Sequence, residues 1–330
     1  MTIRSNSVSL AAEFLNNEDV VAIPTETVYG LAGNAFSPKA VQKIYKLKGR
    51  PKEHPLILHT DSIEKIDNWV TDFPKKAKRL ALHFWPGPLT LVLPKNKIIP
   101  NNITGGKPTV AIRIPNHSIT LELLKRLDFP LVAPSANPFM SVSPTQPNHV
   151  VNYFEPDLRM VLDGGSCTEG LESTIVGFED ETPVIYRLGS ISVEEIEQVV
   201  GMAKFPTLKK SKVVTPGMHS RHYAPKTPMV LTSHPENLLT EIIASNLVLL
   251  RFKDRLPDCL HHQIVLSEKG SLKEAASKLY ETLHQLDAFQ FSLIVAEKFP
   301  NKGLGKTIND RLERASKSVF DCTSKNIFTE

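Results

Sequence analysis

The chain has 330 residues, of which 41% are apolar and 22% charged, and its 39 Lys and Arg against 35 Asp and Glu give a formal net charge of +4. This composition excludes intrinsic disorder, a collagen-like helix and a disulfide scaffold, because apolar residues are plentiful and only three cysteines are present. At about 100–200 residues per domain, the length predicts two domains, each large enough to bury its own core.

The cysteines and the N-terminal segment bear on the compartment. Cys167, Cys259 and Cys322 lie far apart without a C-x-x-C pair, so we expect neither a zinc site nor a disulfide framework. The first apolar stretch, residues 10–15, contains Glu13 and is too short for a signal-peptide core. No run approaches the roughly 18 apolar residues that span a bilayer. We therefore expect a soluble, cytoplasmic protein without membrane contact.

Short β-branched runs alternate with amphipathic segments over the first two hundred residues, an order typical of α/β folds. The predicted strands lie at residues 20–23, 56–59, 90–93, 110–114, 131–133, 160–162, 173–176 and 184–186. The predicted helices lie at residues 38–47, 74–84, 117–126, 147–153 and 193–200. The first predicted domain covers residues 1–203.

The alternation stops after residue 203, and we predict a linker over residues 204–227 from its Pro, Gly and basic residues. Loops of this length in compact proteins are usually functional. A second alternating series then predicts a domain over residues 228–330 with a small, mostly parallel sheet. Its strands are expected at 229–231, 247–250, 264–266 and 293–296, and its helices at 235–244, 272–286 and 304–316.

Several well-known motifs can be excluded. Residues 303–307, GLGKT, resemble a phosphate-binding loop, but that motif requires glycine at position 300, which is Pro300. Proline also has no N–H to offer a phosphate. The chain has no G-x-S-x-G, no H-E-x-x-H and no G-x-G-x-x-G after the first strand. Covalent hydrolysis and dinucleotide redox chemistry therefore have little support.

What remains is a set of polar residues near strand ends, where α/β sheets bind ligands. Thr25 and Thr27 follow the first predicted strand, and they either direct hydroxyls toward a ligand or only stabilise a turn. His59 ends the strand at 56–59, where a lone histidine is more often structural than catalytic. Arg113 lies inside an apolar strand and needs a carboxylate or phosphate partner.

Basic and hydroxyl side chains add candidates for phosphate binding. Lys48 and Arg50 flank Gly49, where the helix at 38–47 should end before Pro51. Cations at a helix C-terminus are favourable by about 0.3–1 kcal/mol. The same residues also suit a polyphosphate, which can be bound by the ammonium group of a lysine together with the planar guanidinium of an arginine.

The sequence APSAN at 133–137 follows another predicted strand and brings Ser135 and Asn137 close together. No base signature lies near Ser135, so we interpret it as a phosphate or ribose ligand rather than a nucleophile.

In this order, the motifs resemble those of the threonylcarbamoyl-AMP synthase family in its two-domain form, a YrdC-like catalytic domain with a C-terminal extension. The resemblance covers nearly the whole chain and rests on PTETVYGL (24–31), KGRP (48–51), WPGPLT (85–90), AIRIP (111–115), APSAN (133–137), ESTIV (172–176), PGM (216–218), HYAP (222–225), GLG (303–305) and NDRL (309–312). It implies a twisted mixed sheet with helices, plus a smaller, mostly parallel, Rossmann-like α/β domain.

The resemblance also implies a reaction in which L-threonine, bicarbonate and ATP, with Mg²⁺, give threonylcarbamoyl-AMP and pyrophosphate. A downstream tRNA threonylcarbamoyl transferase would then modify tRNAs that read ANN codons. Two alternatives stay open: an RNA-binding module, for example for tRNA, without ATP turnover, and a carbamoyl transferase that consumes carbamoyl phosphate. A weak direct contact with tRNA is also left open.

Carried over motif by motif, the resemblance implies two sets of site residues and no metal ligand from protein side chains. The ATP set is Lys48, Arg50, His54, Thr109, Ser135, Asn137, Ser143, Arg187 and Tyr223. Within it, the residues expected to act in catalysis are Lys48, Arg50, Ser135 and Asn137. The threonine set is Thr27, His59, Arg113, Ser173 and the backbone at Ala133. Tyr223 is expected to fold over the nucleotide as a lid.

This chain departs from the usual wording of the family at two places. His54 stands where relatives usually carry Asn, and residues 218–221 differ from the commoner linker sequence. Both departures fall at positions where the resemblance implies contacts with the nucleotide.

Overall fold

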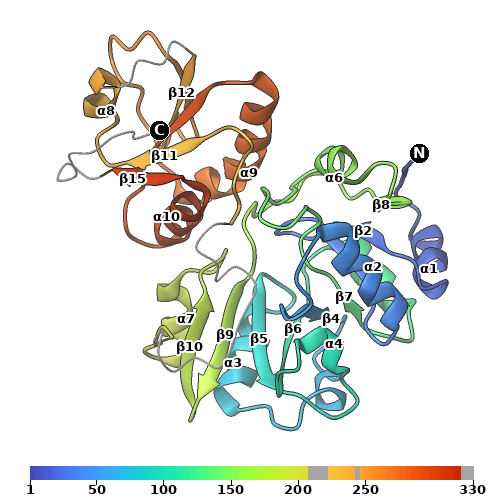
Figure 1. Cartoon of the computed structure of the whole chain (residues 1–330). Coiled ribbons are helices and arrows are strands. Elements are labelled where there is room, and N and C mark those ends of the chain that lie inside the picture. The colour runs from blue at the N-terminus through green and yellow to red at the C-terminus, as the bar shows by residue number, and fades with distance from the viewer. Residues whose placement is uncertain (207–221, 242–245, 321–330) are drawn as a thin grey trace. The chain divides into compact units, whose positions relative to one another are not determined.

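The computed structural model describes residues 1–206, 222–241 and 246–320, which divide into two compact units (Figure 1). The first unit is Met1–Phe139 with Ser143–Met218, and the second is Met140–Val142 with His219–Glu330. The division after residue 218 falls within the range 204–227 where we place the linker. Cys322 and the departures at residues 218–221 lie outside the described residues.

Among the described residues of the first unit, ten strands form one mixed sheet in the order β1-β8-β2-β3-β7-β4-β6-β5-β9-β10. The strands are β1 (Ile3–Ser5), β2 (Val21–Ile23), β3 (Gly30–Asn34), β4 (Ile57–His59), β5 (Leu89–Pro94), β6 (Thr109–Arg113), β7 (Leu131–Val132), β8 (Met160–Leu162), β9 (Thr174–Glu179) and β10 (Thr182–Arg187). Every strand predicted for this part of the chain is present within a few residues, whereas β1 and β3 were not predicted.

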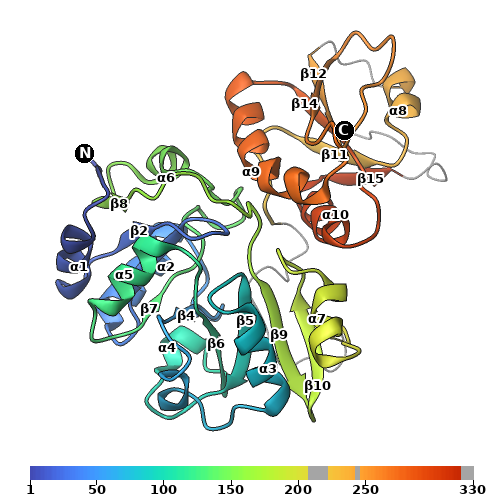
Figure 2. The ribbon, with the colours of Figure 1, turned by 180° about the vertical axis from the view of Figure 1, so that it is seen from behind.

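Helices cover both faces of this sheet. They are α1 (Val8–Asn16), α2 (Pro38–Lys48), α3 (Lys75–Phe84), α4 (Asn101–Thr104), α5 (Ser118–Lys125), α6 (Pro147–Phe154) and α7 (Val193–Val200), with a 3₁₀ turn η1 at Ile66–Asn68. Ile44, Leu80 and Ile196 from α2, α3 and α7 join the larger core on one face. Leu15 of α1 and Leu123 of α5 join a second core on the opposite face, where these two helices lie together (Figure 2).

The alternation of side chains along the central strands decides which residues reach a ligand. Leu58 in β4 and Ile112 in β6 point into the larger core. Their neighbours Ile57 and Ala111 join a small apolar cluster on the opposite face. Because strand side chains alternate with a period of two, His59 and Arg113 share the face of this small cluster.

In the described part of the second unit, five parallel strands form a sheet in the order β13-β12-β14-β11-β15. The elements are β11 (Met229–Thr232), α8 (Pro235–Glu241), β12 (Leu247–Arg251), β13 (His262–Val265), α9 (Leu272–Phe289), β14 (Leu293–Glu297), α10 (Leu304–Ala315) and β15 (Ser318–Phe320). The expected fold class is confirmed, and β15 is an additional strand. None of the helices in the described ranges is both long and apolar enough to cross a membrane.

Candidate functional site

Lys48 connects the end of α2 to the loop after β7. The helix begins at Pro38 after the Ser37 cap and ends at Gly49, whose left-handed backbone (φ 61°) closes the last turn. Buried Lys48 then donates through Nζ to the carbonyl oxygens of Ser135 and Asn137, both at 2.6 Å. These contacts bring together three residues that the sequence assigned to ATP.

The charge of Lys48 is destabilised by its surroundings. Burial lowers the pKa of its ammonium group well below the usual value, and nearby Arg50 lowers it further. The Glu172 carboxylate acts in the opposite direction. A phosphate placed here would therefore restore the charged form.

Phe139 lies beside two further members of the ATP set. The Arg50 guanidinium lies 6.0 Å from the centre of the Phe139 ring, and the His54 ring lies 5.4 Å from it. Arg50 also donates from Nη2 to the carbonyl of Pro55 at 3.1 Å. The backbone N–H of Phe139 donates to the carbonyl of Lys48 at 2.7 Å, which joins this group to the first one.

Glu172 and Ser173 tie the start of β9 to the site. Ser143 donates through Oγ to Oε1 of buried Glu172 at 2.7 Å. Arg187 donates from Nη2 to the carbonyl of Ser173 at 2.8 Å and to its hydroxyl at 3.0 Å. The Ser173 hydroxyl also lies 2.7 Å from Oγ1 of Thr90. Arg187, assigned to ATP, and Ser173, assigned to threonine, are thus direct neighbours.

The Thr25–Thr27 turn connects β2 to β3 and is fully internal. The backbone N–H groups of Thr27 and Val28 both donate to Oγ1 of Thr25 at 3.2 Å, so Thr25 stabilises the turn. Thr27 is buried, and its hydroxyl lies 2.8 Å from that of Thr25. The turn-forming interpretation therefore holds for Thr25.

Arg113 and His59 occupy paired positions on two parallel strands, β6 and β4. His59 is buried, and its Nδ1 donates to the carbonyl of Ile57 at 3.0 Å. Burial and the adjacent Arg113 charge lower the pKa of His59 to about 3, which keeps the ring neutral. The expected acidic partner of Arg113 is Glu26, whose Oε1 lies 2.8 Å from Nη2.

Ala133 places the loop after β7 next to these strands. Its N–H donates to the carbonyl of Ile57 in β4 at 3.2 Å. The same loop continues to Ser135 and Asn137, which hold Lys48. The loop over residues 133–137 therefore lies between the cation of Lys48 and the strands that present His59 and Arg113.

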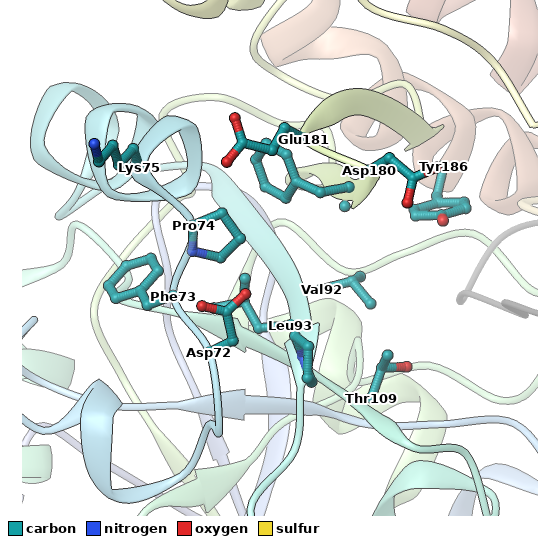
Figure 3. Close-up of a pocket in the computed structure, with 13 residues that line it drawn as sticks. Asp72, Phe73, Pro74, Lys75, Val92, Leu93, Thr109, Asp180, Glu181 and Tyr186 are labelled. Atoms are coloured by element: carbon teal, nitrogen blue, oxygen red, sulfur yellow. The ribbon is translucent and has the colours of Figure 1, made fainter.

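Thr109 lies at the opposite end of β6 from Arg113, about 13 Å away at the usual rise per residue. It lines a hollow of about 500 Å³ together with Val92 and Tyr186 (Figure 3). Asp180 and Glu181, from the turn between β9 and β10, lie at the same hollow. Thr109 shares a strand face with Arg113 but none of the contacts above.

Tyr223 belongs to the second unit, whereas the other candidates belong to the first. Its side chain is buried, with the Arg311 guanidinium 4.5 Å from the ring centre and the Tyr280 ring stacked at 6.0 Å. The expectation that Tyr223 covers the nucleotide stays a prediction.

Four site residues were given no role from the sequence: Glu26, Thr90, Phe139 and Glu172. Glu26 and Glu172 stand inside the quoted motifs PTETVYGL and ESTIV. Neither lies inside an apolar stretch, because Glu26 stands between two threonines and Glu172 precedes Ser173, so no local sequence signal marks either as a buried site residue. Thr90 and Phe139 show no such signal.

Comparisons with known protein families and with known proteins give matches along nearly the whole chain. Residues 13–189 match the family model described as "Telomere recombination", and residues 191–317 match "Threonylcarbamoyl-AMP synthase, C-terminal domain". The threonylcarbamoyl-AMP synthase of Pyrococcus abyssi is 37% identical over 94% of this chain and 94% of its own length. That of Bacillus subtilis is 36% identical over 94% of this chain and 92% of its own.

Solved structures give the same result. The structure of P. abyssi Sua5 complexed with L-threonine matches with a TM-score of 0.86 at 34% identity, covering 97% of this chain and 99% of that one. Escherichia coli YciO matches with a TM-score of 0.52 at 21% identity, over 57% of this chain and 96% of its own, and so shares the fold of one part.

Proposed function

Because the chain belongs to the threonylcarbamoyl-AMP synthase family, we propose that the polar side chains of its first unit hold ATP and threonine next to each other. The enzyme makes threonylcarbamoyl-AMP and is a nucleotidyltransferase. The assignment of single residues below is the proposal.

The structure of the product defines which bonds form and which break in the reaction. The amine of L-threonine takes up the carbon of bicarbonate, with loss of water, to give an N-carboxylated threonine. An oxygen of the new carboxylate attacks the α-phosphorus of ATP, and the bond from that phosphorus to pyrophosphate breaks. The product is a mixed anhydride, so a pocket that excludes water protects it. Such a reaction needs placement and charge neutralisation rather than a protein nucleophile.

The ATP side of the proposed site is the cationic half. Lys48 and Arg50 neutralise phosphate charge, with Ser135 and Asn137 in the loop that Lys48 holds. The other proposed contacts are His54, Thr109, Ser143 and Arg187, with Tyr223 as the lid. In the described residues, no group of three His, Cys, Asp or Glu side chains is placed to hold a metal ion. We propose that Mg²⁺ enters with the phosphates of the substrate, as MgATP, as the family resemblance implies.

The threonine side is the more buried half. Arg113 binds the substrate carboxylate, neutral His59 lies beside it on β4, and Thr27, Ser173 and the backbone at Ala133 complete the pocket. The observation that supports the proposal most directly is the loop at 133–137. It contacts Lys48 at one end and β4 at the other, and so connects the two halves.

The proposal extends to partners and compartment. The product is passed to a tRNA threonylcarbamoyl transferase, because a mixed anhydride needs an acceptor before water reaches it. The free thiols of Cys167 and Cys259 support a reducing compartment, as in the cytoplasm.

Pyrophosphate release from MgATP tests the function, with L-threonine and bicarbonate left out in turn. We expect release only when both are present. Release without threonine, or consumption of carbamoyl phosphate instead of bicarbonate, would favour the carbamoyl transferase alternative. Salt-sensitive tRNA binding without any pyrophosphate release would favour the RNA-binding alternative.

A further inference from the structure

Glu26 lies in the proposed threonine pocket and has no part in the reaction as described above. The side chains of Glu26 and Arg113 are only 6% and 5% exposed, and Oε1 lies 2.8 Å from Nη2. The two charges touch, but their atoms are not aligned for a hydrogen bond. Within the described residues, Oε1 of Glu26 and Nε and Nη2 of Arg113 have no hydrogen-bond partner.

The two unpartnered nitrogens of Arg113 have a particular geometry. Nε and Nη2 form the side edge of the guanidinium, which can bind a carboxylate through two parallel hydrogen bonds. Glu26 compensates the charge of Arg113 from beside Nη2, where Oε1 lies 2.8 Å away without forming a hydrogen bond. Its other oxygen, Oε2, accepts the backbone N–H of Asn116 at 3.0 Å, which fixes the carboxylate in place. Nε and Nη2 of Arg113 therefore keep their hydrogen-bonding capacity for a ligand carboxylate.

The other titratable groups beside this pair are neutral near pH 7. Burial and Arg113 lower the pKa of His59 to about 3. Burial lowers the pKa of His117 below its usual value of 6.5, against the opposing effect of Glu26. Burial raises the pKa of the Cys167 thiol to about 12. Arg113 and Glu26 themselves form an ion pair whose formal charges sum to zero.

We propose that Glu26 is a specificity-determining residue: by balancing Arg113, it makes the pocket select a zwitterionic α-amino acid over a simple carboxylate. A zwitterion adds no net charge to the buried pair. A lone carboxylate adds a negative charge next to Glu26, and this is unfavourable in a site of low dielectric constant. The inference rests on the proposed role of Arg113 in threonine binding.

The test compares L-threonine with (R)-3-hydroxybutyrate, which lacks only the amino group. The Kd of each is measured by calorimetry with the full chain, Glu26→Gln and a control, Glu122→Gln, whose side chain is 52% exposed on α5. We expect the preference for threonine to fall by about ten-fold or more in Glu26→Gln and to be unchanged in the control. An unchanged preference in Glu26→Gln would overturn the inference, even if both ligands bind more weakly, because a structural defect weakens both alike.

A second measurement needs no variant and covers the case in which Glu26→Gln does not fold. In the unaltered chain, 3-hydroxybutyrate should bind much more weakly than threonine, and any binding should take up a proton at Glu26. Calorimetry in buffers of different ionisation enthalpy measures this uptake. Equal affinity without proton uptake overturns the inference alone. Failure of threonine itself to bind overturns the proposed function and this inference with it.

Discussion

At the scale of single residues, burial and neighbouring charges decide how the ionisable side chains of this site behave. Arg113, Glu26 and His59 are all buried. Arg113 and Glu26 form an ion pair, whereas burial and the adjacent Arg113 charge lower the pKa of His59 to about 3 and keep its ring neutral. Because the imidazole of His59 is neutral, it adds no second positive charge beside Arg113.

His59 should make the fold sensitive to acid. Its pKa is about 3 in the folded chain, against 6.5 for a free histidine, so between these values only the unfolded chain is protonated at this residue. The stabilisation is complete above pH 6.5 and is lost as the pH falls below it. From pH 6.5 to pH 5 we expect a loss of about 2 kcal/mol.

Urea unfolding at pH 7 and pH 5 measures this loss in the unaltered chain and in His59→Asn, which keeps an N–H donor near Ile57. Other titrating groups act equally in both chains and cancel in the comparison. The unaltered chain should lose about 2 kcal/mol more than the variant. The same loss in both would show that His59 is not the group responsible.

At the scale of elements, the end of α2 and the start of β9 place the cationic and hydroxyl side chains. Gly49 ends α2 with φ 61°, and a Cβ there would have nothing within 4 Å. The strain of a substitution is therefore confined to the backbone. Gly189 is different, because its Cβ would lie 2.3 Å from the backbone nitrogen of Thr174. Glycine at 189 thus lets the chain pack directly on the segment that holds Ser173.

Gly49→Ala should reduce both stability and ATP use. The positive φ costs about 1 kcal/mol in the free energy of unfolding. Displacement of Lys48 and Arg50 should raise the KM for ATP roughly ten-fold. Gly270→Ala serves as control, because Gly270 has φ 70° in the second unit and would meet only the flexible Lys253 side chain. A similar KM for ATP in both variants would contradict the role of the α2 terminus.

Some of the helices and strands could be predicted from the sequence, and others could not. The ends of α2 at Pro38 and Gly49 were predictable, because Pro and Gly restrict the backbone locally. β3 was missed because GLAGN has no β-branched residue, and its strand geometry comes from pairing with β2 and β7. The pair of Arg113 with Glu26 joins distant parts of the chain, so a local pattern indicated only that Arg113 needs an acidic partner. Thr109 was grouped with the ATP residues by motif alone.

At the scale of the whole molecule, the second unit includes a three-residue segment that lies, in the sequence, between two candidate ATP residues. Met140–Val142 is part of the second unit, although it lies between Asn137 and Ser143 in the sequence. The N–H of Ala224 donates to the carbonyl of Met140 at 2.9 Å, and Ser141 pairs with Ala224 in a β-bridge. Met140 has φ 73°, which is uncommon for a residue other than glycine.

A fragment of residues 1–205 should therefore lose most or all of its activity. Without Ala224, the segment at 140–142 has no bridge to hold its backbone, and the loop between Asn137 and Ser143 loses its position. Pyrophosphate release per mole of folded protein measures the effect, with circular dichroism as the check on folding. A folded fragment with full activity would contradict the role of the second unit and the lid assigned to Tyr223.

The central claim is that one pocket of the first unit holds threonine and ATP through separate side chains. Paired calorimetric titrations of both ligands into Arg113→Ala, Arg113→Lys and Arg50→Ala test it most directly. Both Arg113 variants should weaken threonine binding about 100-fold and spare ATP, and Arg113→Lys keeps a charge beside Glu26 so that the fold is preserved. Arg50→Ala should do the reverse. Threonine titration curves for the Arg113 variants that equal those of the unaltered chain would contradict the account.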